Sequence, residues 1–200
     1  MLLKKLKVVK DELRRKHKKI RQACPPELKA SLDGKIAEKF LSLEEYKNAS
    51  TLFAYVSSSI EIGTEEIILR AFADGKKVAV PKCTDKDGNM DFYYITSYEQ
   101  LKVGTFSILE PDVEVCKPVT SYQDGICVVP GLCFDNFGFR VGFGKGYYDR
   151  FLQKFKGTTV GLCYSKCIEK EIPKGIYDKC VDILITDKYI NYTNNVFSKG

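Results

Sequence analysis

The residues with the clearest capacity for chemistry lie between positions 128 and 152, VVPGLCFDNFGFRVGFGKGYYDRFL. Glycine recurs there at 138, 142, 144 and 146, with Arg140 and Lys145 among the glycines and Asp135 and Asp149 flanking them. Glycine lets a ligand approach the backbone N–H groups closely, and a following helix N-terminus favours anions. Cations suit phosphate oxygens, and a carboxylate suits a metal. The stretch predicts a nucleotide-phosphate site.

The glycine pattern matches neither of the two best-known phosphate loops. Gly144-Lys145 is followed by Gly146 where a Walker A loop has Ser or Thr, and the glycines stop short of a G-x-G-x-x-G fingerprint. A plain strand–loop–helix connection is the alternative. The cations, the tyrosine pair 147–148 and Asp149 favour a binding site over that alternative.

The carboxylates and tyrosines each allow two interpretations. Asp149 and Asp182 are candidate magnesium ligands, because Mg²⁺ takes one or two carboxylates together with phosphates and water; for Asp182 a plain loop role is equally open. Tyr147 and Tyr148 can wall in a flat heterocycle or pack into the core, and we expect one of each kind.

Glu61 follows a small polar loop, Ser57-Ser58-Ser59. An ionised carboxylate there can accept hydrogen bonds from a ring amide and an amine. The alternative is an acidic residue that favours the dipole of the next helix, although Glu65 and Glu66 fit that role better.

The charge is concentrated at the N-terminus. Residues 1–21 hold ten Lys or Arg and two acidic residues, a local +8, which leaves 22 basic and 24 acidic residues, or −2, in the remainder of a chain of net charge +6. Lys10 and Arg14 are four residues apart and share a helix face, with Lys7, Lys18 and Arg21 nearby. A solvated basic face, a phosphate site and a nucleic-acid-binding helix are all open.

The single histidine, His17, lies in this basic segment, and we expect it to be solvent-exposed. A Ser-His-Asp or Cys-His nucleophile would need it as the base, far from any apolar pocket in sequence. This argues against a hydrolase.

The composition, 44% hydrophobic and 29% charged over 200 residues, is ordinary for one globular domain, and we expect a single domain over 1–200. No apolar run approaches the ~20 residues of a membrane span, and the N-terminus lacks the core of a signal peptide, so we expect a cytoplasmic protein without membrane contact. Cys127, Cys133 and Cys163 lie in or beside apolar strand patterns and are expected in the core.

The elements that must hold these residues follow from periodicity. We expect helices over 2–22, 27–46, a segment from Thr64 to a cap at Gly75, a short piece at 97–101, and 146–156; and strands over 51–56, 77–81, 90–95, 125–130, 158–164 and 181–186, with a hairpin turn at Asp87-Gly88. Alternating strands and helices predict a Rossmann-like, three-layer α/β fold with a mainly parallel sheet. Glu61 and the 131–146 loop both follow strands, so both can face one cleft.

The run PGLCFDNFGFRVGFGKGYYDRF strongly resembles the signature of the 5-formyltetrahydrofolate cyclo-ligase family, also called methenyltetrahydrofolate synthetases. Four further pieces resemble the family in order and spacing: Lys10-x-x-x-Arg14, the run EIGTEEI from Glu61, Val80-Pro81-Lys82, and VDILIT from Val181. The resemblance covers nearly the whole chain.

The resemblance implies an ATP- and Mg²⁺-dependent enzyme that cyclises 5-formyltetrahydrofolate to 5,10-methenyltetrahydrofolate. It implies ATP contacts from Lys10, Arg14 and the stretch Arg140, Val141, Gly142, Phe143, Gly144, Lys145, Gly146, Tyr147 and Tyr148. It implies folate contacts from Val56, Glu61 and the stretch 143–147, and metal contacts from Asp149 and Asp182. Relatives carry a small residue or Arg where this chain has Phe143. Arg140 and Lys145 are then the cations that serve phosphoryl transfer.

Two other functions stay open. One is a nucleic-acid-binding module that uses the basic helix, and the other is a different ATP-dependent kinase or ligase on the same loop. We expect small-molecule substrates, no nucleic-acid partner and a monomer.

Overall fold

The computed structural model describes residues 2–85, 88–104 and 108–193, with side chains from residue 5 onward. Within these ranges the helices are α1 (Leu2–Gln22), α2 (Pro26–Ser42), α3 (Glu44–Asn48), α4 (Glu65–Ala73) and α5 (Tyr147–Lys154), with 3-10 turns η1 (Tyr98–Gln100) and η3 (Ser165–Cys167). The strands are β1 (Thr51–Phe53), β2 (Lys77–Cys83), β3 (Met90–Ile95), β4 (Leu101–Val103), β5 (Leu109–Pro111), β6 (Lys117–Pro118), β7 (Ile126–Val129), β8 (Cys133–Asp135), β9 (Arg140–Val141), β10 (Thr158–Cys163), β11 (Ile168–Glu169), β12 (Ile183–Thr186) and β13 (Ile190–Tyr192).

The main sheet of the described chain has eight strands in the order β13-β12-β10-β7-β1-β2-β3-β6. Its centre, from β12 to β2, is parallel, and the outer strands β13, β3 and β6 are antiparallel. The central strands are buried apolar runs, such as Ile126–Val129 in β7, as expected for strands covered on both faces.

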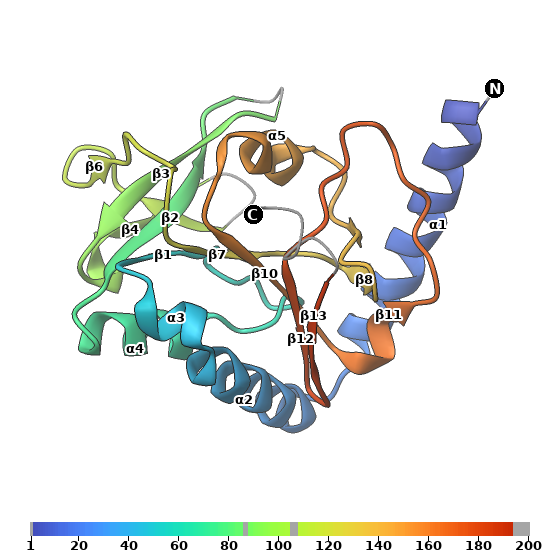
Figure 1. Cartoon of the computed structure of the whole chain (residues 1–200), viewed down its shortest axis with the longest axis horizontal. Helices are drawn as coiled ribbons and strands as arrows, with labels where there is room; N and C mark the ends of the chain where they lie inside the picture. The colour runs from blue at the N-terminus through green and yellow to red at the C-terminus, as the bar shows by residue number, and fades with distance from the viewer. Residues whose placement is uncertain (1, 86–87, 105–107, 194–200) are drawn as a thin grey trace.

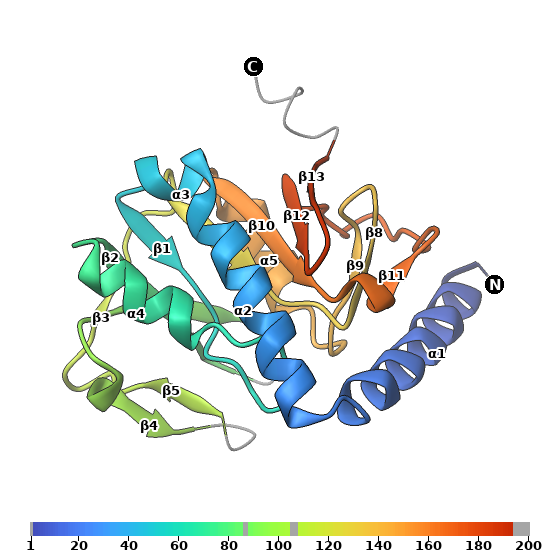
Figure 2. The same cartoon turned by 90° about the horizontal axis from the view of Figure 1, so that it is seen from below.

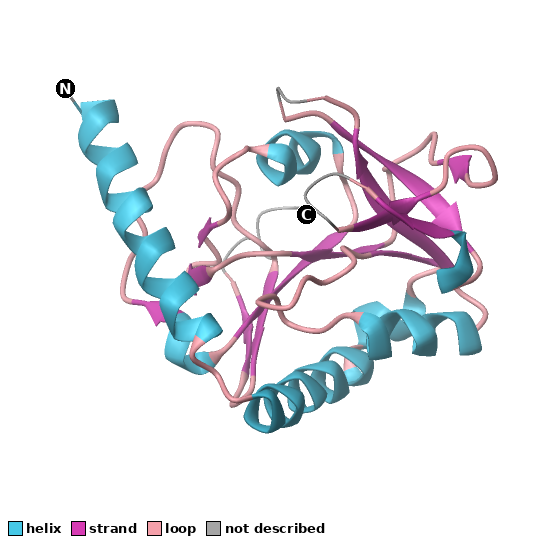
Figure 3. Ribbon diagram, turned by 180° about the vertical axis from the view of Figure 1, so that it is seen from behind, coloured by secondary structure: helices cyan, strands magenta, loops and turns pink. Residues whose placement is uncertain are grey.

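Helices cover both faces of this sheet. Helices α2, α3 and α4 lie along one face, and α5 lies on the other (Figure 1); the view from below shows the three together in front of the sheet (Figure 2). Figure 3 shows the same three layers from behind. The predicted α/β architecture with a mainly parallel sheet is confirmed.

A second, three-stranded sheet, β11-β8-β9, stands beside the main one, and α1 lies along it (Figure 1). The sequence predicted a loop over 131–146, but part of that segment forms β8 and β9. The two strands pair antiparallel, with Cys133 opposite Val141 and Phe134 opposite Arg140. Arg140 therefore lies on a strand.

The predicted elements hold with changes at their ends. The 27–46 helix is divided at Leu43, which is extended (φ −61, ψ 137) and buried. The predicted helix over 97–101 is instead the shorter 3-10 turn η1. Strand β13, which comes after β12, was not predicted. β2 and β3 form the predicted antiparallel hairpin; Asp87 of its turn is outside the described residues.

The core contains an aromatic cluster beneath α5, in which the Phe53, Phe92 and Phe151 rings lie 4.5–6.3 Å apart. Cys127, Cys133 and Cys163 are completely buried, as predicted. None of the helices in the described ranges is both long and apolar enough to cross a membrane.

Candidate active site

The carboxyl ends of the parallel strands open into a cleft of about 650 Å³. The residues that line it come from eight places: Lys10 and Arg14 on α1, residues 55, 56 and 58–61 after β1, Pro81 and Cys83 on β2, Met90 on β3, residues 108–110 at β5, Pro130 after β7, residues 140–149, and Asp178 in the segment between β11 and β12. This is the end of an open α/β sheet where ligands bind.

Of the candidate residues, the structure brings all but Asp182 to this cleft. Val56 and Glu61 line it on one side, and the whole stretch 140–149 lines it on the other. Helix α1 lies against β8 and β9 and brings Lys10 and Arg14 to the same space. Three segments far apart in sequence therefore converge on one cavity.

Glu61 is held by the loop that precedes it. Its Oε2 atom accepts hydrogen bonds from the Ser58 amide at 2.9 Å and the Ser58 hydroxyl at 2.7 Å. Glu61 is only 8% exposed, yet it lines the cleft. Oε1, for which no hydrogen bond is found in the described chain, is the oxygen available to a ligand.

The glycine loop is shaped around Arg14. The Arg14 Nε atom donates to the Gly142 carbonyl at 2.9 Å. Gly144 has a φ of +97°, and a Cβ there would lie 3.1–3.3 Å from the Arg14 guanidinium. The backbone conformation favours glycine, and any larger residue would also displace the Arg14 side chain by a few tenths of an ångström. Gly146, with φ +77°, is the N-terminal cap residue of α5, and it lines the cleft together with Tyr147 and Tyr148 of the first turn. A helix N-terminus, which favours anions, therefore borders the site.

Arg140 lies deeper in the site than the other cations. Its side chain is only 5% exposed, and its Nη1 atom donates to the Asp149 Oδ1 atom at 2.9 Å. Its Nε atom is buried and has no hydrogen-bond partner among the described residues. Lys145, by contrast, is exposed at the mouth.

The two tyrosines differ in their surroundings. The Tyr147 hydroxyl donates to the Asp85 carbonyl at 3.0 Å. The Tyr148 ring packs against the core near Phe151, and its hydroxyl is buried with no partner among the described residues. Burial raises the pKa of Tyr148 well above its ordinary value, so this hydroxyl stays protonated.

Asp182 lies outside the cleft lining. It is 3% exposed, and its Oδ2 atom accepts hydrogen bonds from the Thr159 amide at 2.9 Å and the Thr159 hydroxyl at 2.7 Å. These bonds join the start of β12 to β10. Asp135, the other flanking carboxylate, is fully buried and accepts bonds from the amides of Phe137, Phe139 and Ile172.

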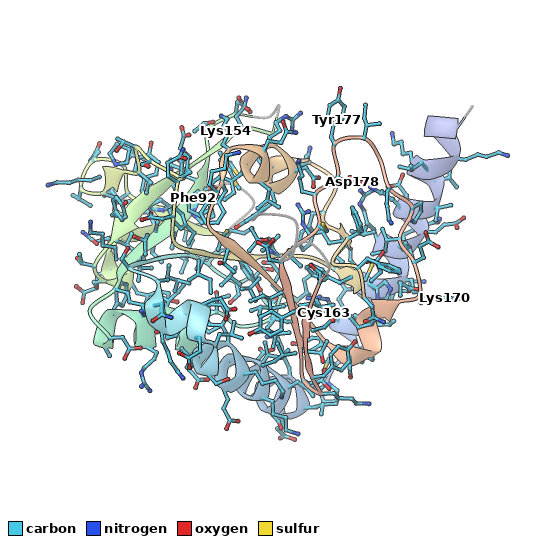
Figure 4. All side chains as sticks on the ribbon, viewed as in Figure 1. Phe92, Lys154, Cys163, Lys170, Tyr177 and Asp178 are labelled. Atoms are coloured by element: carbon cyan, nitrogen blue, oxygen red, sulfur yellow. The ribbon has the colours of Figure 1, made fainter. Side chains whose placement is uncertain are left out.

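Two carboxylates in the cleft were missed by the sequence analysis. Glu110 is 6% exposed and lies 3.4 Å from the Lys82 ammonium. Asp178 forms an ion pair with Lys10, and Figure 4 shows it just after Tyr177, where the segment from Lys170 turns back toward the sheet. Neither has a sequence signal, because Glu110 lies on the three-residue strand β5, which is too short to show alternation, and Asp178 lies in irregular chain between β11 and β12.

The prediction for His17 was wrong. It is 1% exposed, and its Nε2 atom lies 2.6 Å from the Glu169 Oε1 atom on β11. The small sheet covers this face of α1, which the charge pattern alone did not indicate. Burial lowers the pKa of His17, and the hydrogen bond with Glu169 offsets this only in part.

The fold and the cleft together define an α/β enzyme whose site gathers cations, a glycine loop and a held carboxylate. The family model of the 5-formyltetrahydrofolate cyclo-ligase family matches residues 6–187. A Caenorhabditis elegans protein described as a probable 5-formyltetrahydrofolate cyclo-ligase is 32% identical, over 73% of this chain and 73% of its own. A Schizosaccharomyces pombe protein of the same description is 29% identical, over 78% and 83%.

A solved structure extends the likeness. The 5,10-methenyltetrahydrofolate synthetase of Aquifex aeolicus superposes with a TM-score of 0.82 at 33% identity, covering 93% of each chain. The chain belongs to the 5-formyltetrahydrofolate cyclo-ligase family, as the sequence resemblance predicted.

Proposed function

We propose that this protein cyclises 5-formyltetrahydrofolate to 5,10-methenyltetrahydrofolate, with ATP converted to ADP and phosphate and with Mg²⁺ required. One observation carries the proposal beyond family membership. A single cleft holds a carboxylate with an available oxygen, Glu61, opposite a glycine loop that begins at Arg140 and meets the cations of α1. This arrangement suits a flat amide-bearing ring and a polyphosphate side by side.

The chemistry needs ATP because an N-formyl group is an amide and its carbonyl resists attack. The formyl oxygen attacks the γ-phosphorus, and ADP leaves. N10 then attacks the formyl carbon, forming the new C–N bond and losing its proton, and the C–O bond breaks as phosphate departs. Such transfers depend on positioning and charge neutralisation more than on a protein nucleophile.

The cations of the cleft supply that neutralisation. Lys10 and Arg14 on α1, with Arg140 and the loop from Val141 to Tyr148, bind ATP in this proposal. Lys145 reaches the transferring phosphoryl group because its exposed side chain is the one least committed to the protein; no ion pair of Lys145 is found within residues 2–85, 88–104 and 108–193. Arg140, five residues before Lys145 in the sequence, is buried and adds a positive charge that is held in place by Asp149.

The folate side is assigned to Glu61, Val56 and residues 143–147. The 2-amino group and N3–H of a pterin form a donor pair that an ionised carboxylate accepts. Val56 offers an apolar contact beside it. Phe143 is 42% exposed, and the Lys18 ammonium lies 5.4 Å from its ring centroid, so this side chain stands at the mouth.

Mg²⁺ fits a site in which the nucleotide brings most of the ligands. Asp149 lines the cleft next to Arg140 and is the carboxylate we assign to the metal, which would neutralise phosphate charge when bound. Asp182 is also a family metal position, but here its Oδ2 is engaged by Thr159. We therefore propose that Asp182 mainly joins β12 to β10 and that Asp149 is the main metal ligand from the protein.

The alternative function, a different ATP-dependent kinase or ligase that uses the same loop, can be distinguished by whether ATP hydrolysis is coupled to conversion of the folate. ADP release should require 5-formyltetrahydrofolate and should equal the methenyl product formed, mole for mole. A chain that releases ADP equally well with an unrelated hydroxyl or carboxylate substrate would contradict the folate assignment.

The nucleic-acid-binding alternative is disfavoured by where the basic side chains lie. Lys10 and Arg14 face the cleft, Lys16 pairs with Glu169 at 2.6 Å, and Arg21 is buried. We propose that the protein acts as a cytoplasmic monomer on small molecules, without nucleic-acid or membrane partners. An RNA gel shift that persists at 200 mM salt would contradict this, because phosphate contacts weaken steeply with salt.

A further inference from the structure

Arg21, near the end of α1, is a buried cation with an unusual set of partners. It is 4% exposed, and its guanidinium donates to three main-chain carbonyls: Leu132 at 3.0 Å, Gly131 at 2.6 Å and Ile60 at 3.3 Å. No carboxylate forms an ion pair with it among the described residues. Burying a cation is costly unless its N–H groups are satisfied, and here each of the three guanidinium nitrogens donates to a backbone carbonyl.

The three carbonyls belong to the two segments that build opposite sides of the cleft. Ile60 directly precedes Glu61. Gly131 and Leu132 follow β7, and the Leu132 amide donates to the Val141 carbonyl at 2.8 Å, which fixes the strand that begins at Arg140. One side chain thus contacts the carboxylate side and the glycine-loop side at once.

The same helix carries Lys10 and Arg14 to the cleft. Because the guanidinium is planar, its N–H groups hold their acceptors in fixed relative positions. The Tyr164 ring, with its centroid 5.4 Å from the guanidinium carbon, limits the movement of the Arg21 side chain.

We propose that Arg21 is a positioning residue: it sets the separation of the Glu61 loop from the base of the glycine loop and holds both against α1. Arg21 is not among the residues that line the cleft, and it acts through these backbone segments. Its effect on catalysis rests on the proposed function, whereas its effect on the two loops does not.

Hydrogen exchange tests the positioning without relying on activity. In Arg21→Met we expect faster amide exchange in 57–62 and 130–142, where the Glu61 and Leu132 amides bond to Ser58 and Val141 carbonyls, and unchanged exchange in α2. Lys19→Met removes a charge from the exposed side of the same helix and should leave all three regions unchanged. Ile36→Val, a core change in α2, is the control for general loss of stability.

Unchanged exchange in both loop segments of Arg21→Met would overturn the proposal, and so would faster exchange spread evenly along the chain as in Ile36→Val. If Arg21→Met does not fold, Arg21→Lys provides the same comparison, because an ammonium cannot hold three carbonyls in one plane.

Kinetics test the consequence for catalysis. We expect kcat/KM of Arg21→Met to fall roughly 10²-fold, the size seen when reacting groups are displaced by about 1 Å, with KM raised for both substrates and with partial recovery in Arg21→Lys. An Arg21→Met enzyme with wild-type constants would contradict the proposal. If the wild-type chain does not act on 5-formyltetrahydrofolate, the proposed function fails, while the exchange experiment still decides the role of Arg21.

Discussion

The Glu61 carboxylate is both held by the protein and available to a ligand. One oxygen is fixed by two bonds from Ser58, the other has no hydrogen bond among the described residues, and the residue lines the cleft. The sequence indicated a carboxylate at this position but could not choose between a ligand contact and the dipole of α4. The two hydrogen bonds from Ser58 favour the ligand contact, because they hold the Glu61 side chain against the preceding loop and not at the N-terminus of α4.

We predict that Glu61→Gln weakens binding of 5-formyltetrahydrofolate and leaves ATP binding intact. The amide loses a charge-assisted bond pair worth about 1.5–3 kcal/mol, so folate Kd should rise roughly 10- to 150-fold. Calorimetric titration of both ligands measures this. Glu66→Gln, in the exposed first turn of α4, is the matched control. Unchanged folate affinity would contradict this prediction and would indicate that Glu61 instead interacts favourably with the dipole of α4.

Lys145 carries the strongest prediction about the transition state. Lys145→Met keeps the length of the side chain but removes its charge, and we expect kcat to fall roughly 10²-fold or more, as for loss of one donor to developing charge. Steady-state kinetics provide the test, with Lys154→Met in the last turn of α5 as control. An effect confined to the KM for ATP would mean that Lys145 binds only the ground state.

The two candidate metal ligands lie in different surroundings and should behave differently. Asp149→Asn should raise the Mg²⁺ concentration needed for half-maximal activity, because Asp149 lines the cleft. Asp182→Asn should mainly lower the melting temperature, because Asp182 joins β10 to β12 through Thr159. Titration of Mg²⁺ and thermal unfolding separate the two effects. A large rise in Mg²⁺ requirement for Asp182→Asn would contradict this division.

At the scale of elements, α1 shows what periodicity can and cannot predict. The stripe of apolar residues located the helix at the correct residues, 2–22. It did not reveal that His17 and Arg21 are buried, because the partner surface, β11-β8-β9, forms from short pairings between segments distant in sequence. Two-residue strands such as β9 and β11 leave no alternation to detect.

The burial of His17 predicts that the free energy of unfolding depends on pH. Burial lowers the pKa of His17, so the folded state favours the neutral ring, and below about pH 6.5 the unfolded chain binds more protons. Stability is then fully present above that value and falls as pH decreases toward the folded pKa. The groups facing His17 are Lys16 and Arg21 on α1 and Glu169 on β11.

Unfolding in urea at several pH values between about 7.5 and 5.5 measures this. His17→Gln keeps a donor for Glu169 but cannot take up a proton, so the slope of stability against pH should flatten. Because His17 is the only histidine in the sequence, an equal slope in the variant and the wild type would contradict the assignment.

At the scale of the whole molecule, parallel strands explain why the site was largely predictable. Each apolar run identified a central strand, and the carboxyl ends of such strands must meet at one edge, so Glu61 and the glycine loop were expected at one cleft. The wall from β5 and the segment that carries Asp178 were not predicted, because a three-residue strand shows no alternation and the irregular segment has no pattern that fixes its path. The resemblance added the ATP and folate roles that the residues alone left open.

The measurement that tests the central claim most directly is the absorbance of 5,10-methenyltetrahydrofolate formed from 5-formyltetrahydrofolate by the purified protein. We predict product only when ATP and Mg²⁺ are both present, with formation abolished by excess chelator and restored by added Mg²⁺. Absence of product with both present, or full turnover without ATP, would contradict the account.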